Sequence, residues 1–242
     1  MGIDHLAVLE RYGEAFGDAV DGNLERAVPS CPGWTVDDLV AHLAEVQGWW
    51  TSVVLAKGER PDADAARRAG ETGPDRVAGW REITARYQAV QRFCSPDAVL
   101  WAWWGEEGKD RATAVAWRQA HELVVHCWDA QSAVGAPEPV PADLAADGVD
   151  EFIDHCLGDR ARGLGPVVVE LVAPDRSWLI GAPDGTGALR RLDAGGATVT
   201  VTVAGTAEQL YLLLWGRLAP EEVRVTGDRE VLGRVLAGSE TE

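Results

Sequence analysis

The chain has 242 residues, enough for one large domain or two small ones, each with a buried core. Hydrophobic residues make up 46% of it and charged residues 25%, which are ordinary values for a folded, soluble protein. Acidic residues outnumber basic ones by 39 to 22, for a net charge of −17. A surface this negative repels nucleic-acid phosphates and anionic lipid headgroups, so it disfavours nucleic acids and membranes as partners.

The chain shows no sign of export or membrane insertion. No apolar run reaches the roughly 18 residues that a membrane-spanning helix needs. The N-terminus has acidic residues in its first turns and no basic segment, unlike a secretory signal peptide. The four cysteines are scattered without a C-x-x-C pair and are expected to be reduced thiols. We therefore expect a cytoplasmic protein, and the strong preference for arginine over lysine is typical of a high-GC genome.

The first half of the chain predicts a bundle of helices. Apolar residues recur with a period near 3.6 along residues 4–21. They do so again after Thr35, a predicted N-cap with an aspartate three residues later as a weak capping box. Two more helices are predicted over residues 75–93 and 111–134, whereas the charged, Gly/Pro-containing residues 58–75 are expected to form a long surface connection. Four helices of this length favour an antiparallel bundle.

The second half of the chain predicts strands mixed with helices. Residues 135–141 contain three prolines in seven positions and are expected to be a linker. The elements predicted after it are helices over residues 142–157, 206–215 and 229–236 and strands over residues 167–172, 177–180, 198–203 and 223–226. Strands and helices mixed at this density indicate a small α+β domain. The whole chain is thus predicted to be an α+β protein of two domains, residues 1–136 and residues 142–242.

The strongest chemical signal is HELVVH, which runs from His121 to His126. The zinc-protease motif that it resembles has histidines four residues apart, but these two are five apart and so about 140° apart around a helix. They cannot bind one metal ion from one face. Glu122 and His126 are four residues apart and only about 40° apart around the helix, so both can point at one site.

A third metal ligand must come from another helix, and the candidate is His42, in the helix that follows Thr35. One glutamate and two histidines from two helices leave a coordination position open, which is typical of a catalytic divalent-metal site. Plainer interpretations exist, because a Glu–His pair four residues apart is often only solvated and a histidine between apolar residues is often only a core residue. The combination favours a site, since polar groups inside a bundle need partners. His121 is expected to lie outside it.

Two segments carry a resemblance to a known family. CPGWTVDDLVAHL (Cys31 to Leu43) and HELVVHCWDA (His121 to Ala130) resemble motifs of the mycothiol-dependent maleylpyruvate isomerase family, part of the DinB-like superfamily of metal-binding four-helix bundles. That family typically shows P-G-W-[ST]-x-x-D-[LV]-x-x-H-[LV] at the start of its second helix and E-x-x-x-H-x-W-D in its last. The resemblance implies a DinB-like four-helix bundle over residues 1–136 and a small α+β domain similar to sterol carrier proteins over residues 142–242.

The resemblance also implies roles for particular residues. His42, Glu122 and His126 match the metal ligands of the family, which usually bind zinc, so a divalent metal (Zn²⁺) with open coordination and the cofactor mycothiol are implied. An arginine often stands before Trp-Asp in the last motif, but here Cys127 fills that place. Arg217 matches a second-domain arginine that reaches toward the metal cleft in the family; its plainer interpretation is an arginine that ends a helix.

The function implied by the resemblance is that of a mycothiol-dependent isomerase or thiol transferase. A metal-bound thiolate would add to a small electrophilic substrate such as an unsaturated acid, and Arg217 would hold the substrate carboxylate and stabilise enolate charge. The expected partners are this small-molecule substrate and a low-molecular-weight thiol. Two alternatives remain: a metal-dependent biosynthetic enzyme of the same fold that does not use mycothiol, and a non-catalytic ligand-binding or regulatory protein on the same scaffold.

Other residues have open interpretations at this point. The tryptophans at positions 49, 50, 101, 103 and 104 would either line a ligand pocket or pack in the core. Asp129, three residues after His126, would either support a neighbouring group from outside the metal's ligand set or be a helix-surface acid.

Overall fold

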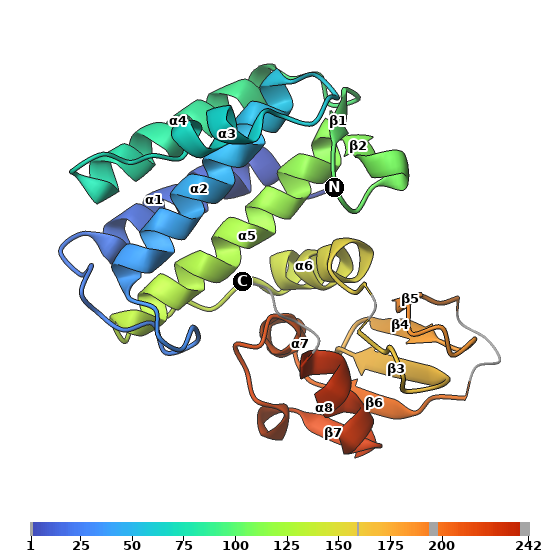
Figure 1. The fold of residues 1–242 in the computed structure, drawn as a ribbon. Helices are drawn as coiled ribbons and strands as arrows, with labels where there is room; N and C mark the ends of the chain where they lie inside the picture. The colour runs from blue at the N-terminus through green and yellow to red at the C-terminus, as the bar shows by residue number, and fades with distance from the viewer. Residues whose placement is uncertain (1, 159, 194–197, 238–242) are drawn as a thin grey trace. The chain divides into compact units, whose positions relative to one another are not determined.

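The structure, a computed structural model, describes residues 2–158, 160–193 and 198–237. The chain divides into two compact units, Met1–Glu138 and Pro139–Glu242 (Figure 1). The first unit is mainly helical and the second combines helices with a sheet, which confirms the predicted α+β class. No helix in the described parts of the chain is both long and apolar enough to cross a membrane.

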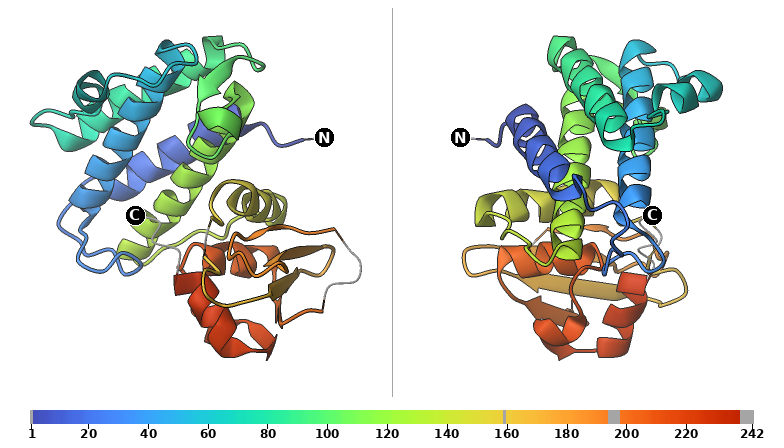
Figure 2. Two further views of the ribbon diagram at one scale, coloured as in Figure 1. Left: turned by 45° about the vertical axis from the view of Figure 1, so that its right-hand side comes forward. Right: turned by 90° about the vertical axis from the view of Figure 1, so that its left-hand side faces the viewer.

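Four long helices build the first unit, as predicted. They are α1 (His5–Val20), α2 (Val36–Leu55), α4 (Arg76–Phe93) and α5 (Ala112–Ala133). Helix α1 packs mainly on α5, and α2 packs mainly on α4. Figure 2 shows these helices, coloured blue to green, side by side in two further views. Their facing sides form one continuous core that includes Phe16, Leu43, Trp50, Trp80 and Leu123.

The start of α2 fixes the rotation of the helix that carries His42. The predicted capping box is confirmed: the Asp38 backbone N–H donates to the Thr35 hydroxyl at 3.3 Å, and the Thr35 backbone N–H donates to the Asp38 carboxylate at 2.8 Å. The Thr35 backbone N–H and hydroxyl both donate to the Asp38 carboxylate and hold the pKa of Asp38 below its ordinary value. The helix therefore begins at a defined residue, and His42 stands two turns into it.

The interpretation of residues 58–75 as a surface connection throughout is wrong. The segment contains a helix, α3 (Ala63–Ala69), whose N-terminus is capped by Asp62. This helix packs on α2 at two glycines, because a Cβ on Gly48 would lie only 2.4 Å from the backbone nitrogen of Gly70. Seven residues are too few to show a helical period, and the contact depends on the absence of side chains.

A small hairpin that the sequence pattern did not predict precedes α5. Strand β1 (Val99–Trp101) pairs antiparallel with β2 (Lys109–Arg111), and the 3-10 turn η1 (Glu106–Gly108) lies between them. Each strand has three residues, too few for an alternating pattern to stand out.

The second unit matches the predicted order of helices and strands. Its elements are α6 (Ala142–His155), β3 (Val167–Val172), β4 (Ser177–Ala182), β5 (Arg190–Arg191), β6 (Val201–Ala204), α7 (Ala207–Leu214), η2 (Pro220–Glu222), β7 (Arg224–Gly227) and α8 (Arg229–Ala237). In the part of the chain that the structure describes, five strands form one sheet in the order β5-β4-β3-β6-β7. Within this described sheet β3 pairs parallel with β6, and the other neighbouring strands pair antiparallel. The strand predicted over residues 198–203 begins later, at Val201, and β5 was not predicted.

Candidate metal centre

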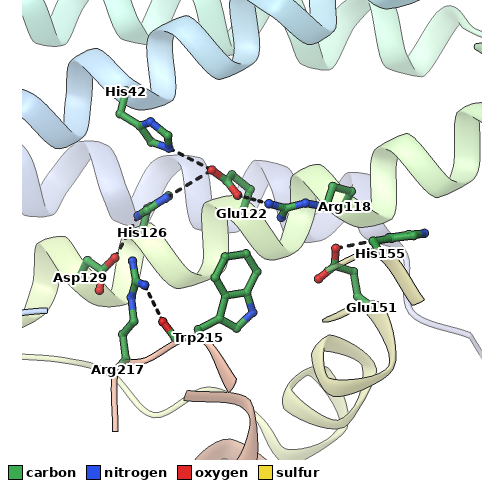
Figure 3. Close-up of polar contacts among 9 residues, drawn as sticks. All are labelled: His42, Arg118, Glu122, His126, Asp129, Glu151, His155, Trp215 and Arg217. Atoms are coloured by element: carbon green, nitrogen blue, oxygen red, sulfur yellow. Dashed lines mark hydrogen bonds and ion pairs between the residues drawn. The ribbon is translucent and has the colours of Figure 1, made fainter. Parts of the chain in front are cut away.

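Three polar side chains from α2 and α5 face one another inside the helical unit (Figure 3). The Nε2 atom of His42 lies 3.1 Å from Oε1 of Glu122, and Nε2 of His126 lies 3.3 Å from the same oxygen. One donor atom from each residue lies within 4.8 Å of the other two. Glu122 and His126 are buried and His42 is half-buried, so the cluster is largely shielded from solvent.

A carboxylate on the Nδ1 side of the His126 ring, opposite the nitrogen that faces Glu122, holds the ring in one orientation. Its Nδ1 lies 2.9 Å from Oδ2 of Asp129, and the Ser30 hydroxyl donates to Oδ1 of Asp129 at 2.5 Å. Asp129 is fully buried, so its interpretation as a helix-surface acid is wrong. With its Nδ1 proton donated to this carboxylate, a neutral His126 would carry its lone pair on Nε2, facing Glu122.

The second oxygen of Glu122 is bound by an arginine. Arg118, one turn earlier on α5, donates from Nη2 to Oε2 at 2.7 Å and leaves Oε1 to the two histidines. Burial alone would raise the pKa of Glu122, but the Arg118 charge and the hydrogen bonds with His126 and His42 outweigh it and hold that pKa well below its ordinary value. Glu122 is therefore an ionised carboxylate.

The protonation of His126 follows from the same contacts. Burial alone would lower the pKa of His126, but hydrogen bonds to Asp129 and Glu122 and the negative charges of both raise it. With Nδ1 bonded to Asp129, a neutral His126 would present a lone pair to an ionised carboxylate, which is repulsive. Either a proton or a metal cation between Nε2 and Oε1 removes this repulsion. The donor set, two imidazole nitrogens and one carboxylate oxygen, fits a divalent ion such as zinc.

The sequence comparisons identify the family. Residues 6–131 match the family described as Mycothiol maleylpyruvate isomerase N-terminal domain, and residues 143–234 match the one described as MDMPI C-terminal domain. The chain belongs to the mycothiol maleylpyruvate isomerase family. The resemblance inferred from the two motifs is thereby confirmed. No curated protein matches the chain significantly.

Solved structures support the same fold. A crystal structure of the mycothiol-dependent maleylpyruvate isomerase is similar with a TM-score of 0.64 and 17% identity, over 92% of this chain and 91% of that one. A crystal structure of a histidine-to-alanine mutant of that isomerase is similar with a TM-score of 0.64 and 16% identity over the same shares. At this level of identity the comparison shows that the fold is shared along almost the whole length.

Arg217, the arginine implied by the family resemblance, lies in the second unit, three residues after the end of α7. Its backbone N–H donates to the carbonyl of Leu212 at 2.7 Å, and Nη1 donates to the carbonyl of Trp215 at 2.6 Å. These two bonds fix the turn that ends α7 and part of the guanidinium. Its role toward a substrate stays a prediction.

Two neighbours of the candidate ligands lie outside the cluster. His121 is fully buried, its ring centroid lies 6.3 Å from that of His5, and it is not one of the three residues whose donor atoms converge. Cys127 is buried in the hydrophobic core of the helical unit. Burial together with the charge of Glu138 raises the pKa of its thiol to about 12. Such a thiol stays protonated at neutral pH and is a poor metal ligand.

The tryptophans predicted as either pocket wall or core pack mostly against each other. The Trp50 ring is buried and lies 5.3 Å from the rings of both Trp103 and Trp104, centroid to centroid. Trp104 donates from Nε1 to Asp110 at 2.8 Å, which ties this cluster to β2. Trp103 is 54% exposed. The packing interpretation therefore holds for Trp50 and Trp104.

The sequence reasoning missed two residues of the centre, Arg118 and Ser30. Arg118 carried a usable signal, because it stands four residues before Glu122 and so on the same helix face. Ser30 carried none, because it lies in an irregular segment 99 residues away from the aspartate that it contacts.

Proposed function

We propose that this chain is a metal-dependent, mycothiol-dependent enzyme that isomerises or thiolates a small electrophilic substrate of the unsaturated-acid type. His42, Glu122 and His126 bind the divalent ion, Zn²⁺, in this proposal. The observation that carries it is the convergence of their three donor atoms within 4.8 Å, in a chain of the mycothiol maleylpyruvate isomerase family. Its partners are the small acid and the thiol, in the cytoplasm; a net charge of −17 disfavours nucleic acids and membranes.

Each residue of the proposed site would have a separate role in the reaction. A divalent ion at this position would lower the pKa of a coordinated thiol and keep it a thiolate at neutral pH. Glu122 and two neutral imidazoles add only one negative charge to the ion, so the site keeps a net positive charge. Asp129 orients His126, and Arg118 occupies the Glu122 oxygen that does not face the histidines. Arg217 binds the substrate carboxylate and stabilises negative charge that develops during the reaction.

The first test is the metal content of the purified, dialysed protein, measured by elemental analysis. We expect about one equivalent of zinc in the wild type and none in His126→Ala. His155→Ala is the matched control, because its ring pairs with Glu151 in the second unit. It should keep the metal. Circular dichroism checks that each variant is folded. A wild type that stays metal-free after zinc reloading would refute the enzyme proposal and favour the binding protein.

The second test is turnover of maleylpyruvate with mycothiol, followed by absorbance. We expect zinc-dependent isomerisation or consumption of the thiol, and a decrease in kcat/KM of roughly 10²–10³-fold in Arg217→Met. A zinc-containing protein with no activity toward thiol and unsaturated acids would refute the use of mycothiol. The metal-dependent biosynthetic enzyme would then be the better interpretation.

A further inference from the structure

A groove of about 640 Å³ opens at the end of the helical unit where α2 and α4 terminate beside β1. Val54 on α2, Val90 on α4 and Leu100 on β1 form part of its wall. Val54 is 12 residues beyond His42, which is about 18 Å along the helix axis. The groove is therefore separate from the candidate metal centre, and its volume lies within the range of small-molecule sites, roughly 300–1,000 Å³.

Unusually exposed apolar side chains line this groove. Among the described residues, five large hydrophobic side chains are strongly exposed, and three of them line it: Leu55 at 62%, Phe93 at 89% and Val99 at 55%. Exposed apolar area concentrated at one place on a soluble protein is typical of a binding surface. The apolar part of a ligand would cover these side chains.

The only formal charge in the lining is Lys57. The other polar groups are the Ser95 hydroxyl and the Cys94 thiol, whose pKa is raised by burial, so that it is neutral at pH 7. No ion pair joins Lys57 to another residue in the part of the chain that the structure describes. Lys57 is exposed, and it makes no ion pair among the described residues although the chain has an excess of acids.

The backbone holds Lys57 in a conformation that lysine rarely adopts. Its φ is +50°, in the left-handed region, where glycine or asparagine usually follows a helix. The next residue, Gly58, has a φ of +93° and lies against β1, since a Cβ there would be 2.9 Å from the Val99 carbonyl oxygen. This close approach fixes the turn and keeps the lysine at the groove despite the backbone cost.

We propose that this groove binds an amphiphilic monoanion, a medium-length saturated carboxylate, with its chain against Leu55, Phe93 and Val99 and its carboxylate at Lys57. A cation would be repelled by Lys57, and a neutral apolar molecule would leave the ammonium unpaired. A second copy of the chain fits less well, because it would bring together two surfaces of net charge −17.

The test uses decanoate, with decanol as the uncharged match, added to the full-length protein below the concentration at which either aggregates. Calorimetry should show one decanoate per chain with a Kd on the order of 10–100 μM. Lys57→Met should weaken decanoate binding about two- to fivefold, because the charge pair is exposed, and leave decanol binding unchanged. Lys109→Met removes the only other lysine, which lies on β2, and is the matched control.

Alkylation of the cysteines locates the ligand. Decanoate should slow the reaction of N-ethylmaleimide with Cys94, which lines the groove, and leave Cys156 in the second unit unaffected. Ala89→Trp, a partly exposed helix position in the groove wall, should abolish both binding and protection while the helix stays folded.

Three results would overturn the proposal. The first is decanoate binding that leaves Cys94 unprotected. The second is equal decanoate affinity in the wild type and Lys57→Met, which would remove the carboxylate contact. The third is dimerisation in sedimentation experiments that shields Cys94 without ligand, which would make a second copy the occupant.

Discussion

Replacing Asp129 by asparagine should weaken zinc binding without unfolding the bundle. Asp129 is fully buried and holds Nδ1 of His126 at 2.9 Å and the hydroxyl of Ser30 at 2.5 Å. Asparagine keeps the shape and can still bond to both groups, with its amide oxygen toward His126 and its amide nitrogen toward Ser30. What it loses is the negative charge that orients the imidazole and strengthens it as a ligand.

The size of the effect follows from the position of Asp129 behind a ligand. Removing such a partner typically lowers metal affinity 10- to 100-fold, which is about 1.4–2.7 kcal/mol. Ser30→Ala removes only the bond to the other carboxylate oxygen and leaves the charge in place. It should therefore lower the affinity less than about tenfold, since the Asp129–His126 contact remains.

The assay is competition for zinc against a chelating dye of known affinity, with circular dichroism to verify folding. We expect the order wild type, Ser30→Ala, Asp129→Asn from tightest to weakest binding. A folded Asp129→Asn that binds zinc as tightly as the wild type would show that the ring orientation of His126 does not depend on this carboxylate.

Three further predictions concern packing and thiol chemistry. Gly48→Ala should lower the melting temperature, because its Cβ would meet Gly70 at 2.4 Å, at a cost of roughly 1–3 kcal/mol. Gly233→Ala, a helix position with open space around it, should raise that temperature slightly, and the same sign for both would contradict the packing argument. Tyr87→Phe should be at least as stable as the wild type, since the buried Tyr87 hydroxyl has no hydrogen-bond partner among the described residues. A clearly lower melting temperature of this variant would show that the hydroxyl does make a stabilising hydrogen bond. The alkylation rate of Cys94 should rise about tenfold per pH unit up to about pH 9, because burial raises its pKa; a plateau near pH 8 would contradict this.

The sequence predicted the elements whose signals are local and repeated. The helix stripes extend over four or more turns, and the Thr35 capping box marks one start to the residue. The convergence of Glu122 and His126 followed from their spacing on one helix. His42 was chosen because it lies on another helix and matches the family motif, and the geometry brings its ring to 3.1 Å from Glu122.

The parts that escaped prediction depend on contacts between distant segments. Helix α3 is stabilised by two glycines that meet across 22 positions, and β1 and β2 are strands only because they pair with each other. The contact of Ser30 with Asp129 likewise has no sequence period. Such features follow from tertiary packing, which overrides local propensity and produces no pattern in a short stretch of sequence.

The strand order of the second unit has a consequence for behaviour at high concentration. The outer strands are β5, of two residues, and β7, of four, so few unpaired backbone groups are offered at either edge. Both carry arginine: Arg190 and Arg191 on β5, and Arg224 on β7. Joining two sheets edge to edge would therefore gain few backbone hydrogen bonds, and it would have to accommodate Arg190 and Arg191, which are already ion-paired with Asp184 and with Asp150 and Asp154. Short outer strands of this kind disfavour edge-to-edge pairing between copies of the sheet.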